Sequence, residues 1–148
     1  MANWPQFNNN GDLPVGTYQA TLDEVIEHFG TVTPQRRIMA LRLSRIYQLV
    51  SSTKHLARFI VFGSFVTSKP EPNDIDIFLL MNDTFDASLL TGEAAIVFDH
   101  LAAHNYEGAS IFWIRRQAAI GGEQEAVEYW RIKRDGTKRG IVEVISND

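Results

Sequence analysis

Residues 57–81, ARFIVFGSFVTSKPEPNDIDIFLLM, decide the fold of this protein. The stretch begins and ends with short apolar runs, residues 57–62 and 74–81, which have the length and composition of mostly buried strands. The segment between them, SFVTSKPEPN, contains two prolines and several turn-forming residues, so no strand can bridge it. The stretch therefore predicts two strands joined by an irregular loop.

Two aspartates open the second predicted strand, in the order Asp74-Ile75-Asp76-Ile77. Side chains two residues apart on a strand point to the same face, so we expect Asp74 and Asp76 to project together, with Cα atoms about 6.6 Å apart. Neighbouring carboxylates repel each other, and a bound divalent cation is the common reason for tolerating them beside an apolar run. Mg²⁺ is the natural candidate, because one or two carboxylates and a substrate's phosphate oxygens usually hold it.

The first predicted strand ends at Gly63-Ser64, which supplies groups for phosphate. A glycine lets the backbone approach a ligand closely, while the N–H and hydroxyl of Ser64 donate to phosphate oxygens. Lys69, in the following loop, is placed to pair with a terminal phosphate. Groups for phosphate at one end of the stretch and groups for a metal ion at the other indicate a site for a nucleoside triphosphate.

Each of these features also has a plainer interpretation. Asp-x-Asp alone is often a pair of solvated acids, Gly-Ser is often a turn, and Lys69 alone is often a solvated loop lysine. The combination, between two apolar runs, favours the nucleotide site.

His100 and His104 lie four residues apart on a predicted helix, but no glutamate or further ligand accompanies them, so we interpret them as helix surface. The basic pairs at 36–37, 115–116 and 138–139 are interpreted as solvated, with 115–116 also placed to meet an acidic acceptor or RNA.

The rest of the chain predicts alternating helices and strands in one domain, residues 1–148, after an irregular N-terminal arm at residues 1–20 that Trp4, Phe7 and Leu13 pin to the core. Start signals at Thr21 and Thr33 predict two helices, the second reaching about Ser52. The remaining predicted elements are a helix at 86–104, a strand at 109–115, a helix at 125–130, a turn at 135–136 and a strand at 140–145. This order predicts an α+β fold, a mixed β-sheet with helices packed on one side.

Composition narrows the classes of protein further. The chain has no cysteine, so it contains no disulfide and no thiolate metal site. The net charge of -4 excludes the strongly basic profile of a protein held on nucleic acid by phosphate neutralisation, and we expect no stable DNA binding. The polar N-terminus and the lack of a long apolar run predict a cytoplasmic protein that does not enter a membrane.

Gly63-Ser64, a short gap and then Asp74-x-Asp76 between hydrophobic residues resembles the signature of the nucleotidyltransferase superfamily, whose fold is similar to the palm of DNA polymerase beta. The resemblance covers residues 56–81 at motif level. The wider layout, with GDLPVGTYQATLDEVIEHFG near the start and RDGTKRGIV near the end, looks like a group of small stand-alone bacterial members. The resemblance implies that Gly63 and Ser64 hold the triphosphate, and that Asp74 and Asp76 are catalytic and hold Mg²⁺.

One position departs from the family pattern. Active members usually add a third carboxylate from a later strand, and the matching strand here begins Ala109-Ser110-Ile111, with Ser110 where the acid is expected. Glu107 and Glu143 are the two acids left as alternatives.

The resemblance implies transfer of a nucleoside monophosphate, from ATP or another nucleoside triphosphate, to a protein, RNA or small-molecule acceptor, with release of pyrophosphate. The alternative is a weak or inactive nucleotide-binding member that acts through a protein partner, as in toxin-antitoxin pairs. Direct RNA binding is a third hypothesis.

Overall fold

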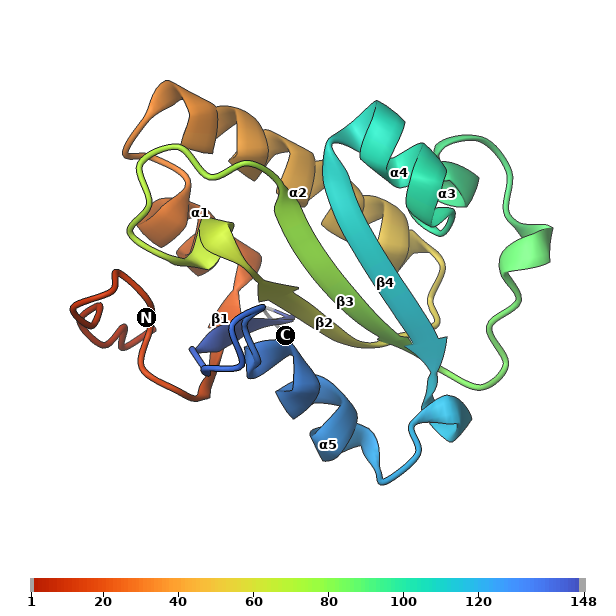
Figure 1. The fold of residues 1–148 in the computed structure, drawn as a ribbon. Coiled ribbons are helices and arrows are strands. Elements are labelled where there is room, and N and C mark those ends of the chain that lie inside the picture. Colours follow the sequence, from red (N-terminus) through yellow and green to blue (C-terminus); the bar gives the residue numbers. More distant parts are fainter. Residues whose placement is uncertain (1, 147–148) are drawn as a thin grey trace.

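Five strands form one mixed sheet in the computed structural model, which describes residues 2–146 (Figure 1). The strands, in chain order, are β1 (Thr17–Thr21), β2 (Leu56–Phe62), β3 (Ile75–Met81), β4 (Ala109–Arg115) and β5 (Ile141–Ile145). Their order in the sheet is β1-β5-β2-β3-β4. β2 runs antiparallel to β3 and β5, while the outer pairs β1–β5 and β3–β4 are parallel. The predicted α+β fold with a mixed sheet is confirmed.

Four of the five helices cover one face of this sheet (Figure 1). They are α1 (Leu22–Phe29), α2 (Pro34–Ser52), α3 (Gly92–Val97) and α4 (His100–Glu107). The fifth, α5 (Glu123–Glu128), packs on the opposite face, where Val127 joins a second apolar cluster with Ile60 and Leu80. The expectation that all helices lie on one side is therefore wrong for α5. Its sequence reveals an apolar side but not which face of the sheet that side meets.

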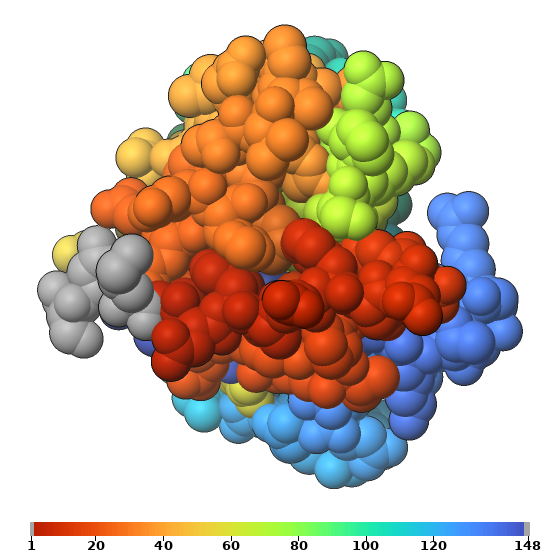
Figure 2. Space-filling model, turned by 90° about the vertical axis from the view of Figure 1, so that its left-hand side faces the viewer, coloured from red at the N-terminus to blue at the C-terminus, as the bar shows by residue number. Residues whose placement is uncertain are grey.

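The N-terminal arm is less irregular than its composition predicts. Leu13 is fully buried, and Trp4 and Phe7 pack against the core, as expected. Residues Thr17–Thr21 nevertheless form β1, whose partner β5 lies at the other end of the chain. Figure 2 shows the arm (red) crossing one side of the molecule, with α1 and α2 (orange) above it. The strand was missed because its pairing is long-range.

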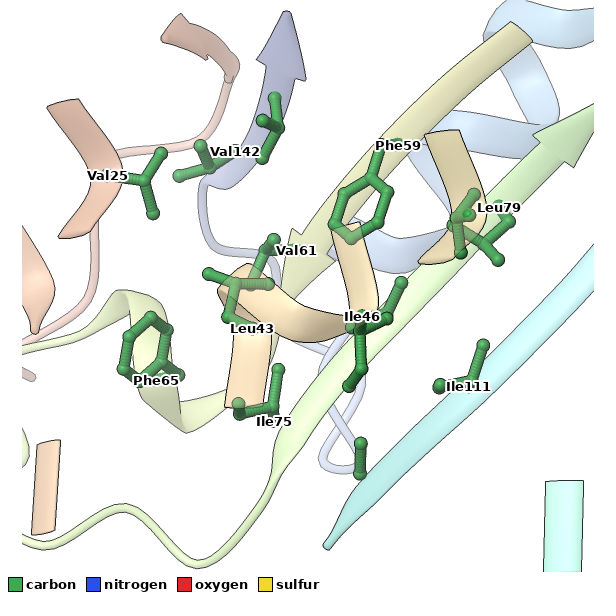
Figure 3. Packing of buried hydrophobic residues seen from close by; sticks show 14 of the residues in the cluster. Val25, Leu43, Ile46, Phe59, Val61, Phe65, Ile75, Leu79, Ile111 and Val142 are labelled. Carbon is green, nitrogen blue, oxygen red and sulfur yellow. The ribbon is translucent and has the colours of Figure 1, made fainter. Parts of the chain in front are cut away.

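The main core lies between the four helices and the sheet (Figure 3). Leu43 and Ile46 of α2 meet Phe59 and Val61 of β2 and Ile75 of β3, and all five side chains are 0% exposed. Burying each of them contributes roughly 1.5–3 kcal/mol. Side chains alternate along β3, so Ile75 faces this core while Phe78 and Leu80 face the other side of the sheet. Asp76 therefore lies on the face away from this core.

Local capping explains where the helices begin. Thr21 accepts a hydrogen bond from the N–H of Glu24 at 3.3 Å, and the Glu24 carboxylate accepts one from the N–H of Thr21 at 2.9 Å. Thr33 caps α2 through its hydroxyl alone, which accepts a hydrogen bond from the N–H of Arg36 at 3.2 Å, and α2 ends at Ser52 as predicted.

The helix predicted over residues 86–104 is wrong as a single element. The structure has a 3₁₀ turn at Ala87–Leu89, then α3 and α4. Asp99 separates the two helices, because its carboxylate accepts a hydrogen bond from the N–H of Ala102 at 3.0 Å and starts a new helix. The final predicted helix, at 125–130, is α5 followed by a 3₁₀ turn at Tyr129–Arg131.

Within residues 2–146, no helix combines the length and the apolar character that crossing a membrane requires.

Candidate functional site

Gly63 brings the end of β2 against the start of β3. Its φ of 79° lies in the region that favours glycine, and a Cβ built there would collide with the carboxylate of Asp76. Phe62, the residue before it, is the register partner of Asp76. Ser64 then opens a 3₁₀ turn, Ser64–Val66. The glycine-serine turn and the second aspartate are therefore immediate neighbours.

Arg36 holds the loop that follows this turn. The side chain is 3% exposed, and its guanidinium donates to the carbonyl oxygens of Phe65 and Thr67, both at 2.7 Å, and to that of Lys69. It also donates to the carbonyl oxygen of Phe29 at 3.0 Å, at the end of α1. The interpretation of this arginine as solvated is wrong, because the loop folds back over α2 and presents its carbonyl groups to the side chain.

Asp74 and Asp76 both line a cavity of about 440 Å³ at this end of the sheet. The cavity combines acids, cations and small polar side chains; its lining residues are Ser64, Asn73, Asp74, Asp76, Ser110, Lys133, Arg134, Asp135 and Arg139. The structure thus brings together Ser64 and the two aspartates, and adds a set of cations from the end of the chain.

The carboxylates of Asp74 and Asp76 repel each other in this cavity. Burial, and then the charge of Asp74, raise the pKa of Asp76 to about 6, while the positive charges of Arg139 and Arg134 oppose the rise. Among residues 2–146, neither carboxylate accepts a hydrogen bond or forms an ion pair. Two such carboxylates fit Mg²⁺, which takes oxygen ligands. Within residues 2–146, no three His, Cys, Asp or Glu side chains are grouped so that they could hold a metal ion by themselves.

The cations of the cavity come from a turn near the C-terminus. Asp135-Gly136 forms the predicted turn, with the N–H of Lys133 donating to the carbonyl oxygen of Thr137 at 2.7 Å. In Figure 2 this segment (blue) projects beside the N-terminal arm (red). Sequence reasoning missed Lys133, Arg134 and Arg139 as site residues; the signal was the run of cations around the turn, KRDGTKR.

Asp12, in the N-terminal arm, fixes two of these cations. Its buried carboxylate lies 3.0 Å from Nζ of Lys133 and 3.2 Å from Nη1 of Arg139. Arg134 makes no hydrogen bond or ion pair through its side chain with other residues of the 2–146 segment. The cavity therefore has two cations in fixed positions and a third that is available to a ligand.

Three predicted candidates lie elsewhere. Lys69 is exposed and does not line the cavity; its backbone oxygen accepts from Arg36 and its N–H donates to the hydroxyl of Thr67 at 3.1 Å. Glu107 is buried and pairs with Arg45 at 3.6 Å. Glu143 pairs with Arg58 at 2.8 Å, lining a different cavity.

Ser110 occupies the position opposite the acids. In the parallel register of β3 and β4 it is the partner of Asp76, and it lines the same cavity. Asp135 adds a further carboxylate to the lining of the cavity. Hydrogen bonds from the side chain and N–H of Thr137, at 2.6 and 2.9 Å, lower the pKa of Asp135 and tie it into the turn.

These features define an α+β protein with a polar cavity, part acidic and part cationic, at one end of a mixed sheet. A family model described as a family of unknown function (DUF6932) matches residues 5–145, and the chain belongs to this family. No curated protein and no solved structure matches the chain.

Proposed function

We propose that this cavity binds a magnesium nucleoside triphosphate and that the protein transfers the nucleoside monophosphate to an acceptor. The observation that carries the proposal is that Asp74 and Asp76, two carboxylates without a hydrogen bond or ion pair to residues 2–146, share a cavity of about 440 Å³ with Ser64 and three cations. A metal-phosphate ligand needs both signs of charge in one place. A purely acidic or purely basic cavity would fit it less well.

Each group has a role that follows from its chemistry. Asp74 and Asp76 would hold Mg²⁺, which, when bound, neutralises charge on the phosphates and orients them. The hydroxyl and N–H of Ser64 donate to phosphate oxygens, and Gly63, whose missing Cβ leaves room for the carboxylate of Asp76, keeps this turn against the aspartate. Lys133, Arg134 and Arg139 pair with the remaining negative charge, a role that the sequence assigned to Lys69.

The reaction we propose is a displacement at the α-phosphorus. The oxygen of an acceptor hydroxyl forms a bond to that phosphorus, the bond to the bridging oxygen breaks, and pyrophosphate leaves with its negative charge held by the cations of the cavity. The proton of the hydroxyl passes to water. Ser110 can orient the acceptor through a hydrogen bond but is not basic enough to take this proton, so we expect slow transfer that accelerates with rising pH.

Ser110 is also the observation behind a second candidate function. In this alternative the protein binds a nucleotide without transferring it and acts through a protein partner, as in a toxin-antitoxin pair. Under either candidate we propose that the protein works in the cytoplasm; a protein, RNA or small-molecule acceptor belongs to the enzyme alone.

Labelled nucleotide separates the two candidates. The purified protein is incubated with Mg²⁺, each of four α-labelled nucleoside triphosphates and cell extract, alongside Asp74→Asn and Glu71→Gln. Glu71 is a matched control because it lies in the same loop, exposed and away from the cavity. Label transfer that Asp74→Asn abolishes and Glu71→Gln retains supports the enzyme. Magnesium-dependent thermal stabilisation without transfer supports the binding protein, and no stabilisation by any nucleotide contradicts both.

A further inference from the structure

An aromatic cluster lies on the face of the sheet that carries Asp76. Its members are Phe62 of β2, Phe78 of β3, Phe112 of β4 and Trp130. The ring centroid of Trp130 lies 4.5 Å from that of Phe62, 5.0 Å from that of Phe112 and 5.3 Å from that of Phe78. Three strands and the segment after α5 therefore contribute rings to one surface.

This aromatic cluster is adjacent to the proposed nucleotide site along β3 and β4. Asp76 and Ser110 are register partners, and so are Phe78 and Phe112, the next residues along the same face. Residues two apart on a strand are separated by about 6.6 Å. The cluster is thus one step along the sheet from the two polar residues, a spacing comparable to the ribose that separates a base from its α-phosphate.

The cluster is open to a ligand beside β4. A cavity of about 390 Å³ is lined by Phe78, Phe112 and Trp130, together with His100 and Ile114. Phe112 is 39% exposed, although it lies in the middle of a strand. α5 covers the β5 and β2 side of this face, where Val127 packs on Ile60 and Ile141, and does not line this cavity. The volume is in the range of small-molecule sites, and planar rings dominate its walls.

We propose that this cavity binds the nucleobase of the nucleotide whose phosphates occupy the neighbouring polar cavity. The inference rests on the proposed function and adds the position of the base. A planar base stacks on exposed aromatic rings, and such stacking tolerates every base because each has a π-face. The Nδ1 atom of His100 already lies 3.1 Å from the carbonyl oxygen of Ile111. This nitrogen is therefore engaged within the protein, and the ring of His100 meets the base through its face. The site therefore binds the four common nucleotides with similar affinity.

Binding of a nucleoside triphosphate and of inorganic triphosphate, each with Mg²⁺, tests this proposal by calorimetry. Phe112→Ala weakens the nucleotide by roughly tenfold or more, the loss expected for one stacking partner, and leaves inorganic triphosphate unchanged. Tyr106→Ala is the matched control, because Tyr106 is an aromatic residue of α4 that is 75% exposed and lies outside this cavity. It changes neither affinity.

Tryptophan fluorescence gives an independent readout. A base stacked beside Trp130 quenches its emission. Trp130→Phe keeps an aromatic ring in the cluster and loses the quenching, whereas Trp4→Phe retains it, because Trp4 packs on His28 and Phe29 and does not line this cavity.

The outcomes separate this inference from the proposed function. If inorganic triphosphate with Mg²⁺ does not bind the wild-type protein, the proposed function is wrong and the base site is lost with it. If inorganic triphosphate binds, but the nucleotide binds no more tightly and Phe112→Ala changes nothing, the polar cavity keeps its role and the aromatic cavity is not the base site.

Discussion

Ser110 of β4 lies directly across from Asp76 of β3 in the parallel register, and both side chains line one cavity. Ser110 is thus the residue through which β4 lines the cavity of the paired carboxylates. An aspartate at position 110 would place its carboxylate beside that of Asp76 in this cavity. The position therefore has the register for a third acid on β4 but carries a hydroxyl.

Ser110→Asp tests this relationship. The added carboxylate should raise the affinity for Mg²⁺ and accept the proton of the attacking hydroxyl, so the rate of label transfer should rise about 100-fold, as for a general base. Single-turnover transfer at saturating nucleotide measures the effect. Ser110→Asn is the control, because asparagine has the size of aspartate but carries no charge. Equal rates for the two variants would contradict the assignment of this position to proton transfer.

Gly63→Ala should destabilise the protein and disrupt the carboxylate pair. The new Cβ would collide with Asp76, and the positive φ adds strain of about 1–3 kcal/mol. Gly136→Ala is a matched control, since Gly136 has φ +86 and no atom within 4 Å of an added Cβ. Urea unfolding should show the larger loss of stability for Gly63→Ala, which should also lose Mg²⁺-dependent stabilisation by nucleotide. Equal losses for the two glycines would mean that the contact with Asp76 is unimportant.

Asp76→Asn should stabilise the metal-free protein at neutral pH. The pKa of Asp76 is raised from 3.8 to about 6. Between pH 3.8 and pH 6 the folded protein therefore keeps a proton on this carboxyl group, whereas the unfolded chain has released it. This contribution to stability is complete below 3.8 and is lost as the pH rises to 6 and above, at a cost of at most about 3 kcal/mol. The variant should therefore melt about 5 °C higher than wild type at pH 7.5 in EDTA.

Melting curves from pH 4.5 to 7.5 check this prediction. The difference between Asp76→Asn and wild type should grow as pH rises, and Glu71→Gln should show no such difference. Mg²⁺ with nucleotide should stabilise the wild type but not Asp76→Asn. A variant that melts below wild type in EDTA across the whole range would make Asp76 a structural residue.

Lys133→Ala should weaken binding of triphosphate. The substitution removes a cation of the cavity and its pair with Asp12, and a lost charge-assisted hydrogen bond corresponds to roughly a 10- to 100-fold change in affinity. Calorimetry with inorganic triphosphate and Mg²⁺ measures it. Lys138→Ala is the control, because Lys138 belongs to the same turn, is exposed and does not line the cavity. The same loss in both variants would point to general charge attraction and not to a built site.

Local sequence signals predicted the elements that depend on near neighbours. Thr21 and Glu24 cap each other three residues apart, so their pattern is sufficient to predict the start of α1. Alternation along a strand predicted that Asp74 and Asp76 come together; they line one cavity although Asp74 lies just before β3, and the turn at Gly63 follows from backbone freedom. The same reasoning failed for residues 86–104, where Asp99 interrupts a helical pattern that apolar spacing alone made continuous.

The sequence by itself determined the α+β class, the mixed sheet and the pair of carboxylates at the start of a buried strand. The tertiary structure decided which distant segments meet. It pairs β1 with β5 and packs α5 on the second face of the sheet. It also places Arg36 beneath the loop and lets Asp12 of the N-terminal arm fix Lys133 and Arg139. Caps and strand alternation depend on neighbours within a few residues. Sheet order and the meeting of charges depend on contacts between distant segments, which no local pattern encodes.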